Sequence, residues 1–117
     1  MNKALALAAA VAFGIAAVPA SAQIKIGFIA TFSGPGGALG QDLYDAFMLG
    51  IDHAGGRLGG QAVEVIREDD QLKPDLAKAA AEQAFGDDKA DIVVGTSSSA
   101  AALAMLPVAE EFKKVMI

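Results

Sequence analysis

Four consecutive hydroxyl residues, Thr96-Ser97-Ser98-Ser99, follow a short β-branched run and precede an alanine-rich segment. A helix that begins near Ser98 or Ser99 leaves its first backbone N–H groups without partners inside the helix. Together with the hydroxyls and the positive end of the helix dipole, these groups bind small anions such as a carboxylate. The alternative is a simple helix cap with solvated neighbours, a common role for serine before a helix. The run therefore predicts an anion site or a cap.

A second candidate is the glycine-rich segment from Ser33 to Gly40. Loops of this kind between a strand and a helix also cradle phosphates, but no Gly-Lys-Ser/Thr follows, so the segment is not a Walker A loop. Counted from Gly34 and Gly36, the third glycine of a dinucleotide fingerprint falls on Leu39. The acids Glu68-Asp69 stand where a ribose-binding carboxylate would follow a second strand. An enzyme that binds a dinucleotide is therefore a minor alternative.

The remaining polar groups do not form a recognisable catalytic or metal motif. The cluster Glu68-Asp69-Asp70 could offer oxygen ligands to calcium, but the alternating ligands of a calcium loop are absent, so a solvated strand end is the preferred interpretation. His53 is the single histidine and the chain has no cysteine, which excludes a typical zinc site. Ser33 does not lie in a G-x-S-x-G elbow. We expect no catalysis, cofactor or metal.

The first 22 residues have the pattern of a secretory signal peptide. Lys3 precedes an apolar run from Ala4 to Val18, and Ala20-Ser21-Ala22 is an A-x-A cleavage site. The run is shorter than the roughly 20 residues of a membrane-spanning helix, which makes a short membrane anchor the weaker interpretation. We therefore expect export to the periplasm, with cleavage after Ala22.

The chain's charge also limits its partners. One of its 9 basic residues and none of its 14 acidic residues lies in the predicted signal peptide, so the remainder carries a formal charge of −6. An acidic chain without a basic stripe lacks the electrostatic footprint of a nucleic-acid-binding protein. Nucleic acid is therefore excluded as an expected partner.

After residue 22, short apolar runs alternate with longer segments of helical period, which is typical of an α/β fold. Strands are expected at 24–32, 61–67, 91–95 and 115–117, and helices at 40–54, 74–85 and from 98 or 99 to about 105. A break or kink is expected at Pro107, followed by a further turn through Glu110 and Phe112. Right-handed crossovers give a doubly wound parallel sheet of order 2-1-3-4 with helices on both faces. Ligands bind such sheets where the strand order reverses, at the carboxyl ends of the strands. The turns 33–40 and 96–99 are therefore expected to face each other across one crevice.

Several segments together resemble the leucine/isoleucine/valine-binding family, the type I periplasmic binding proteins of ABC transporters. The resemblance lies in IKIG with SGP and Gly40, GG, EDD, the Pro-Asp helix start, VG with SSS, and LPVAEE, in that order from residue 24 to residue 111. The family implies two α/β lobes that close over a small solute and then dock on a membrane permease, without catalysis. Residues 23–117 would be the N-terminal part of lobe 1, truncated in its sheet, and residues 1–22 the signal peptide.

The resemblance also implies the ligand-binding positions. In this family the turn after the third strand grips the α-carboxylate of an amino acid, which makes Ser99 the best match, with Ser98 and Ala100 beside it and Ser97 and Thr96 as further candidates. Leu39 corresponds to a pocket-lining position that is often aromatic in relatives, and the leucine here is a departure that leaves the solute open between an amino acid and another small carboxylate. The receptor domain of an exported sensor is a second hypothesis for the same lobe.

Overall fold

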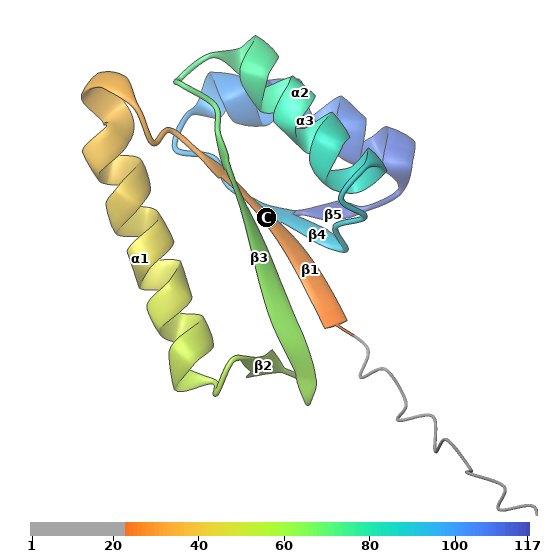
Figure 1. Ribbon diagram of the computed structural model, residues 1–117. Helices are drawn as coiled ribbons and strands as arrows, with labels where there is room; N and C mark the ends of the chain where they lie inside the picture. Colours follow the sequence, from red (N-terminus) through yellow and green to blue (C-terminus); the bar gives the residue numbers. More distant parts are fainter. Residues whose placement is uncertain (1–22) are drawn as a thin grey trace, which may run out of the picture.

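The computed structural model of the protein describes residues 23–117, and the predicted signal peptide lies outside them (Figure 1). The elements, in chain order, are β1 (Gln23–Ala30), a 3-10 turn (Gly34–Gly36), α1 (Gly37–His53), β2 (Arg57–Leu58), β3 (Gln61–Asp69), α2 (Pro74–Gly86), β4 (Ile92–Val94), α3 (Ser99–Phe112) and β5 (Val115–Met116). This alternation of strands and helices confirms the predicted α/β class.

The sheet has the order β2-β3-β1-β4-β5. Strands β3, β1, β4 and β5 are parallel neighbours, so they follow the order expected for four strands, and β2 adds an antiparallel edge that the sequence did not predict. The turn between β2 and β3 consists of Gly59 and Gly60, with φ of 56° and 80°. Two residues with positive φ are the usual requirement of a tight hairpin turn, which explains the glycine pair.

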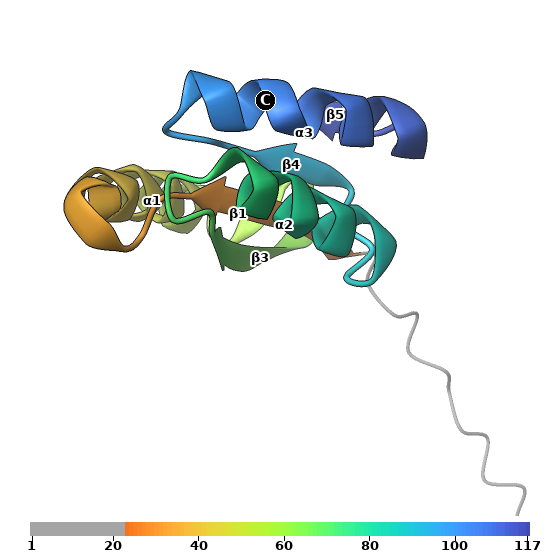
Figure 2. The ribbon, with the colours of Figure 1, turned by 90° about the horizontal axis from the view of Figure 1, so that it is seen from above.

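Helices cover both faces of the sheet (Figures 1 and 2). In Figure 2, α1 lies apart from α2 and α3, which pack side by side on the opposite face. Side chains of β1 alternate between the two faces, as a pleated strand requires. Phe28 packs against Tyr44 and Phe47 of α1, whereas Ile29 belongs to the core formed with α2 and α3.

The face toward α1 is aromatic. The rings of Phe28 and Tyr44 meet edge-on with centroids 5.3 Å apart, and Phe32 extends the cluster toward the carboxyl end of β1. The guanidinium of Arg67 lies 3.7 Å above the Phe32 ring, a cation–π contact that covers the cluster from β3. These contacts fix the position of α1 relative to the strand that leads into the candidate site.

The opposite face is closely packed because its side chains are small. A Cβ at Gly27 of β1 would lie 3.0 Å from the Cβ of Ala84 in α2, so the glycine allows the helix to approach the strand. Val93 of β4 and Met105 of α3 complete this core and are fully buried. The narrow alanine face predicted for the helix at 74–85 therefore lies against the sheet.

Several expected boundaries were wrong. Helix α1 begins at Gly37, so Leu39 lies in its first turn and not in a loop. Strand β1 ends two residues earlier than expected, and β3 continues to Asp69. At Pro107, where a break or kink was expected, α3 is not broken and continues to Phe112 as one helix, which includes the further turn expected there. The carbonyl that loses its helical partner belongs to Leu103, which is 68% exposed, so water can reach that side of the helix.

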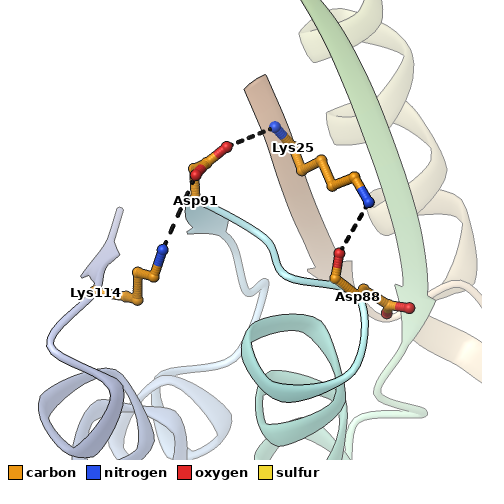
Figure 3. Close-up of polar contacts among 4 residues, drawn as sticks. All are labelled: Lys25, Asp88, Asp91 and Lys114. Atoms are coloured by element: carbon orange, nitrogen blue, oxygen red, sulfur yellow. Dashed lines mark hydrogen bonds and ion pairs between the residues drawn. The ribbon is translucent and has the colours of Figure 1, made fainter. Parts of the chain in front are cut away.

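The amino ends of three strands are joined by polar contacts, at the edge opposite the predicted crevice (Figure 3). The carboxylate of Asp91, which precedes β4, accepts a 2.9 Å hydrogen bond from the backbone N–H of Lys25 in β1. Its other oxygen lies 3.9 Å from the ammonium of Lys114, which precedes β5. The Lys25 ammonium donates to the carbonyl of Asp88 at 3.2 Å. Asp91 thus connects the starts of β1, β4 and β5.

Within residues 23–117, no helix combines the length and the apolar character that a membrane crossing requires.

Candidate functional site

The segments that leave β1 and β4 start side by side at the carboxyl edge of the sheet. The Oγ of Ser97 lies 3.2 Å from Oγ1 of Thr31 and 3.4 Å from its backbone N. Thr31 follows β1 directly, and Ser97 follows β4 after two residues. The chain that leaves β1 therefore meets the predicted turn 96–99 at this edge of the sheet, at a residue that precedes the predicted turn 33–40.

A cleft of about 380 Å³ opens beside this junction. Its walls are apolar side chains of β1, α1 and the end of β4, with Thr96 and Ser97 as polar groups; the lining residues are Phe28, Ala30, Leu43, Phe47, Val94, Gly95, Thr96, Ser97 and Ile117. An apolar cavity with a few polar groups is typical of a small-molecule site. Of the predicted residues, the cleft brings together Thr96 and Ser97, whereas Leu39, Ser98, Ser99 and Ala100 lie outside its lining.

Ser98 is the N-cap of α3. Its hydroxyl oxygen accepts a 3.4 Å hydrogen bond from the backbone N–H of Ala101, and its carbonyl accepts one from Ala102 at 2.9 Å. Ser99 and Ala100 begin the helix and are exposed. Among the described residues, their backbone N–H groups have no acceptor, as expected in the first turn of a helix. The helix start therefore offers two N–H donors and the Ser99 hydroxyl to solvent.

The acidic cluster Glu68-Asp69-Asp70 at the carboxyl end of β3 is part of the folded structure and not the solvated strand end that the sequence suggested. Asp70 is 0% exposed, and its Oδ1 accepts hydrogen bonds from Oγ1 of Thr31 at 2.6 Å and from the backbone N–H of Leu72 at 2.8 Å. Its Oδ2 accepts a short hydrogen bond from Oγ1 of Thr96. Asp70 therefore links the carboxyl ends of β1, β3 and β4.

Asp69 has a separate role at the same edge. Partial burial tends to raise the pKa of its carboxyl, but hydrogen bonds from the backbone N–H groups of Phe32 and Gln71 and from Ser33 outweigh this effect and lower the pKa below 3.8. Oδ1 accepts from Phe32 and from Gln71, each at 2.9 Å. The carboxylate is thus used to fix the start of the glycine-rich segment. The third acid, Glu68, accepts one side-chain hydrogen bond among the described residues, from the Gln83 amide at 3.3 Å.

Metal binding finds no support at this edge. Among residues 23–117, no three His, Cys, Asp or Glu side chains come close enough to hold a metal ion. The exposed His53 lies at the far end of α1. The polar groups at the start of α3 can donate hydrogen bonds to a small anion beside the apolar cleft.

Comparison with known families shows the family to which this chain belongs. The sequence model for periplasmic binding proteins matches residues 23–117, which is all of the described chain. The chain belongs to the periplasmic binding protein family. A comparison with curated proteins finds no match.

Solved structures of periplasmic binding proteins share the fold. An ABC-type branched-chain amino acid transporter from Rhodopseudomonas palustris CGA009 is 49% identical, with a TM-score of 0.76 over 80% of this chain and 26% of that one. A periplasmic binding protein from Burkholderia mallei is 37% identical, with a TM-score of 0.74 over 80% of this chain and 25% of that one.

A third relative was solved with a ligand. It is a solute-binding protein of an ABC transporter from Rhodopseudomonas palustris BisB5, in complex with 3,4-dihydroxybenzoic acid. It is 31% identical, with a TM-score of 0.77 over 80% of this chain and 26% of that one. The chain thus spans about a quarter of the length of the structures it matches.

Sequence reasoning missed two residues of this periplasmic binding protein's candidate site, Thr31 and Asp70. The available signal was positional, because both directly follow a strand and both are polar. Carboxyl ends of neighbouring parallel strands lie at one edge, so a hydroxyl and a carboxylate in these positions could have been paired. Treating the three acids as one solvated cluster concealed this.

Proposed function

We propose that this chain is the N-terminal part of lobe 1 of an exported solute-binding protein, which delivers an amino acid or a related small carboxylate to the membrane permease of an ABC transporter. The family match carries the proposal, because it spans residues 23–117. The matched structures are described as transporter or solute-binding proteins, which supports a binding function over an enzymatic one. Residues 1–22 would act as the signal peptide that directs the protein to the periplasm.

The solute class follows from chemistry that the relatives share. Relatives were solved with 3,4-dihydroxybenzoic acid, with benzoate and with 4-hydroxybenzoate, and another is named for branched-chain amino acids. A carboxylate is the group that all of these solutes have in common. The first turn of α3 supports such a ligand, since free N–H groups at a helix start bind anions.

We assign the carboxylate grip to Ser99, Ser98 and the backbone N–H groups of Ser99 and Ala100. The hydroxyls of Thr96 and Ser97 are already donated within the lobe, to Asp70 and Thr31. Thr96 and Ser97 would therefore line the approach to the ligand. Leu39, 55% exposed in the first turn of α1, is proposed to contact the apolar part of the solute.

A calorimetric binding screen of the full-length secreted protein tests this function. The panel pairs each carboxylate with its amide: leucine with leucinamide, and benzoate and 4-hydroxybenzoate with benzamide and 4-hydroxybenzamide. We expect micromolar or tighter binding of at least one carboxylate and loss of binding for its amide. Equal binding of both members of every pair would contradict a carboxylate grip.

N-terminal sequencing of the secreted protein tests the signal peptide. The mature protein should begin at Gln23, and retention of residue 1 would contradict export by cleavage.

A further inference from the structure

Asp70 is a buried carboxylate that joins three chain segments at the candidate site. It receives hydrogen bonds from Thr31 after β1, from Leu72 in its own turn and from Thr96 after β4. We infer that Asp70 is a positioning residue for ligand binding, which holds the Thr96–Ser98 turn and thereby aims the first N–H groups of α3 at the ligand's carboxylate. This inference rests on the proposed function, because it names the residue that keeps the same site in its binding geometry.

Because it is buried, the Asp70 carboxylate restricts how the turns that donate hydrogen bonds to it can be arranged. Asp70 is 0% exposed, and no lysine or arginine of the described chain forms a salt bridge with it. A buried charge without a counter-ion is stable only while its hydrogen-bond donors stay in place. Two of its three donors are hydroxyls of Thr31 and Thr96, so displacement of either turn leaves the charge undersatisfied. The network therefore favours one arrangement of the two turns.

The direction of the hydrogen bonds follows from the carboxylate. An ionised carboxylate only accepts, so Thr31 and Thr96 must each donate their single hydroxyl hydrogen to Asp70. Thr31 Oγ1 then has only its lone pairs left, and Ser97 must donate to it across their 3.2 Å contact. The hydroxyl hydrogens of Thr96 and Ser97 are thus both donated within the chain and are not available to a solute.

The same network fastens the turn to the sheet. The side-chain hydrogen bonds of Thr96 and Ser97 lead to Asp70 or to Thr31, which is itself bonded to Asp70. The next residue, Ser98, caps α3. A shift of Thr96 would therefore move the cap and the helix start together, and the donors at Ser99 and Ala100 would no longer point where the solute binds.

Two substitutions that hardly change side-chain size should remove the hydrogen bond between Asp70 and the Thr96–Ser98 turn. In Asp70→Asn, the amide nitrogen takes the place of one carboxylate oxygen, so the residue cannot accept from both hydroxyls as before. Thr96→Val removes the hydroxyl from the other partner and keeps the β-branched shape. Either variant should raise the Kd for the carboxylate identified in the screen at least tenfold. The double variant should bind no more weakly than the weaker single variant, because both changes break one link.

Asp91→Ala is the matched control, because Asp91 also joins β1 to β4 but does so at the opposite edge of the sheet. This variant should lower Tm and leave the Kd unchanged. A role of Asp70 in stability alone would give the same pattern, with a lower Tm and an unchanged Kd for Asp70→Asn and Thr96→Val. That result would overturn the inference, as would losses in affinity that add fully in the double variant.

Hydrogen exchange separates a failure of this inference from a failure of the proposed function. In the ligand-free full-length protein, Thr96→Val should accelerate exchange of the Ala101 and Ala102 amides, which donate to Ser98, and Asp91→Ala should not. If the wild-type protein binds no carboxylate, the proposed function fails, and this localised acceleration would still support the positioning of the turn by Asp70. Unchanged exchange in both Thr96→Val and Asp70→Asn would overturn the inference whatever the protein binds.

Discussion

The backbone N–H of Phe32 donates a 2.9 Å hydrogen bond to the carboxylate of Asp69, so the last residue of β3 holds the chain that leaves β1. Since Phe32 also packs against Phe28 and Tyr44, this bond connects the aromatic face under α1 to the carboxyl edge of the sheet. The same oxygen accepts from Gln71. Asp69 and Asp70 are neighbours in sequence, yet each fixes a different part of the site.

The lowered pKa of Asp69 predicts a defined loss of stability in acid. A carboxyl whose pKa is lower in the folded state stabilises the fold above its unfolded value of 3.8, and this contribution is lost as the pH falls through the folded pKa. Asp69→Asn should therefore be less stable than wild type at pH 7, and the difference should shrink below about pH 4. Urea unfolding at several pH values measures it. The same difference in the exposed Asp42→Asn variant would show that the effect is not specific to Asp69.

At the amino edge, Asp91→Ala should lower the free energy of unfolding by about 1 kcal/mol. Most of the loss comes from the hydrogen bond to the Lys25 N–H, since a typical bond of this kind contributes about 0.5–1.5 kcal/mol. The contact with Lys114 is long and exposed, and such ion pairs contribute roughly 0–1 kcal/mol. Lys114→Met should therefore have the smaller effect in denaturant titrations. A loss in Lys114→Met equal to that in Asp91→Ala would assign the stabilisation to the ion pair.

Two glycines of α1 provide an internally controlled test of packing. A Cβ at Gly40 would lie 1.7 Å from the carbonyl oxygen of Thr31, whereas a Cβ at Gly50 would meet no atom within 4 Å. Gly40→Ala should cost at least about 2 kcal/mol, because the helix must move away from the end of β1. Gly50→Ala should stabilise by roughly 0.5–1 kcal/mol, the helix-propensity difference between the two residues. Thermal unfolding distinguishes them, and two variants of equal stability would contradict this close approach.

The elements of this fold could be predicted because periodicity and glycine placement are local signals. The β-branched run at 92–94 indicates a buried strand by itself, and the spacing of the alanines in α2 indicates the helix face that packs on the sheet. The edge strand Arg57–Leu58 could not be predicted in this way, since two residues have no measurable period. It forms because the positive φ of Gly59 and Gly60 turns the chain back along β3.

The site was predicted less completely, because its central contact is not local. Asp70 meets Thr31 and Thr96, which are 39 and 26 residues away along the chain. Sequence reasoning placed the two turns at one edge, and the contact between Thr31 and Ser97 agrees with that. It could not tell that the hydroxyls of Thr96 and Ser97 are donated internally, which requires knowing the partner of each. The ligand-binding roles assigned to Ser99, Ser98, Ala100, Ser97, Thr96 and Leu39 stay predictions.

Ser99→Ala tests that assignment in the full-length protein. The Ser99 hydroxyl has no hydrogen bond within residues 23–117, so its removal should leave Tm unchanged. If it donates to the solute's carboxylate, calorimetry should show binding weaker by about 1–3 kcal/mol, the usual cost when a charged group loses a buried partner. Ser97→Ala should behave differently and lower Tm, because its hydroxyl donates to Thr31.

A change of ligand separates a direct contact from an indirect one. If the solute is an amino acid or a benzoate, its amide lacks the charge that the Ser99 hydroxyl would stabilise, so any residual binding of the amide should be nearly equal in wild type and Ser99→Ala. A uniform loss for acid and amide would mean that the substitution disturbs the start of α3 and not a bond to the carboxylate. An unchanged affinity for the acid would move the grip to the neighbouring N–H groups of Ala100 and its helix turn, which carry no side-chain donor.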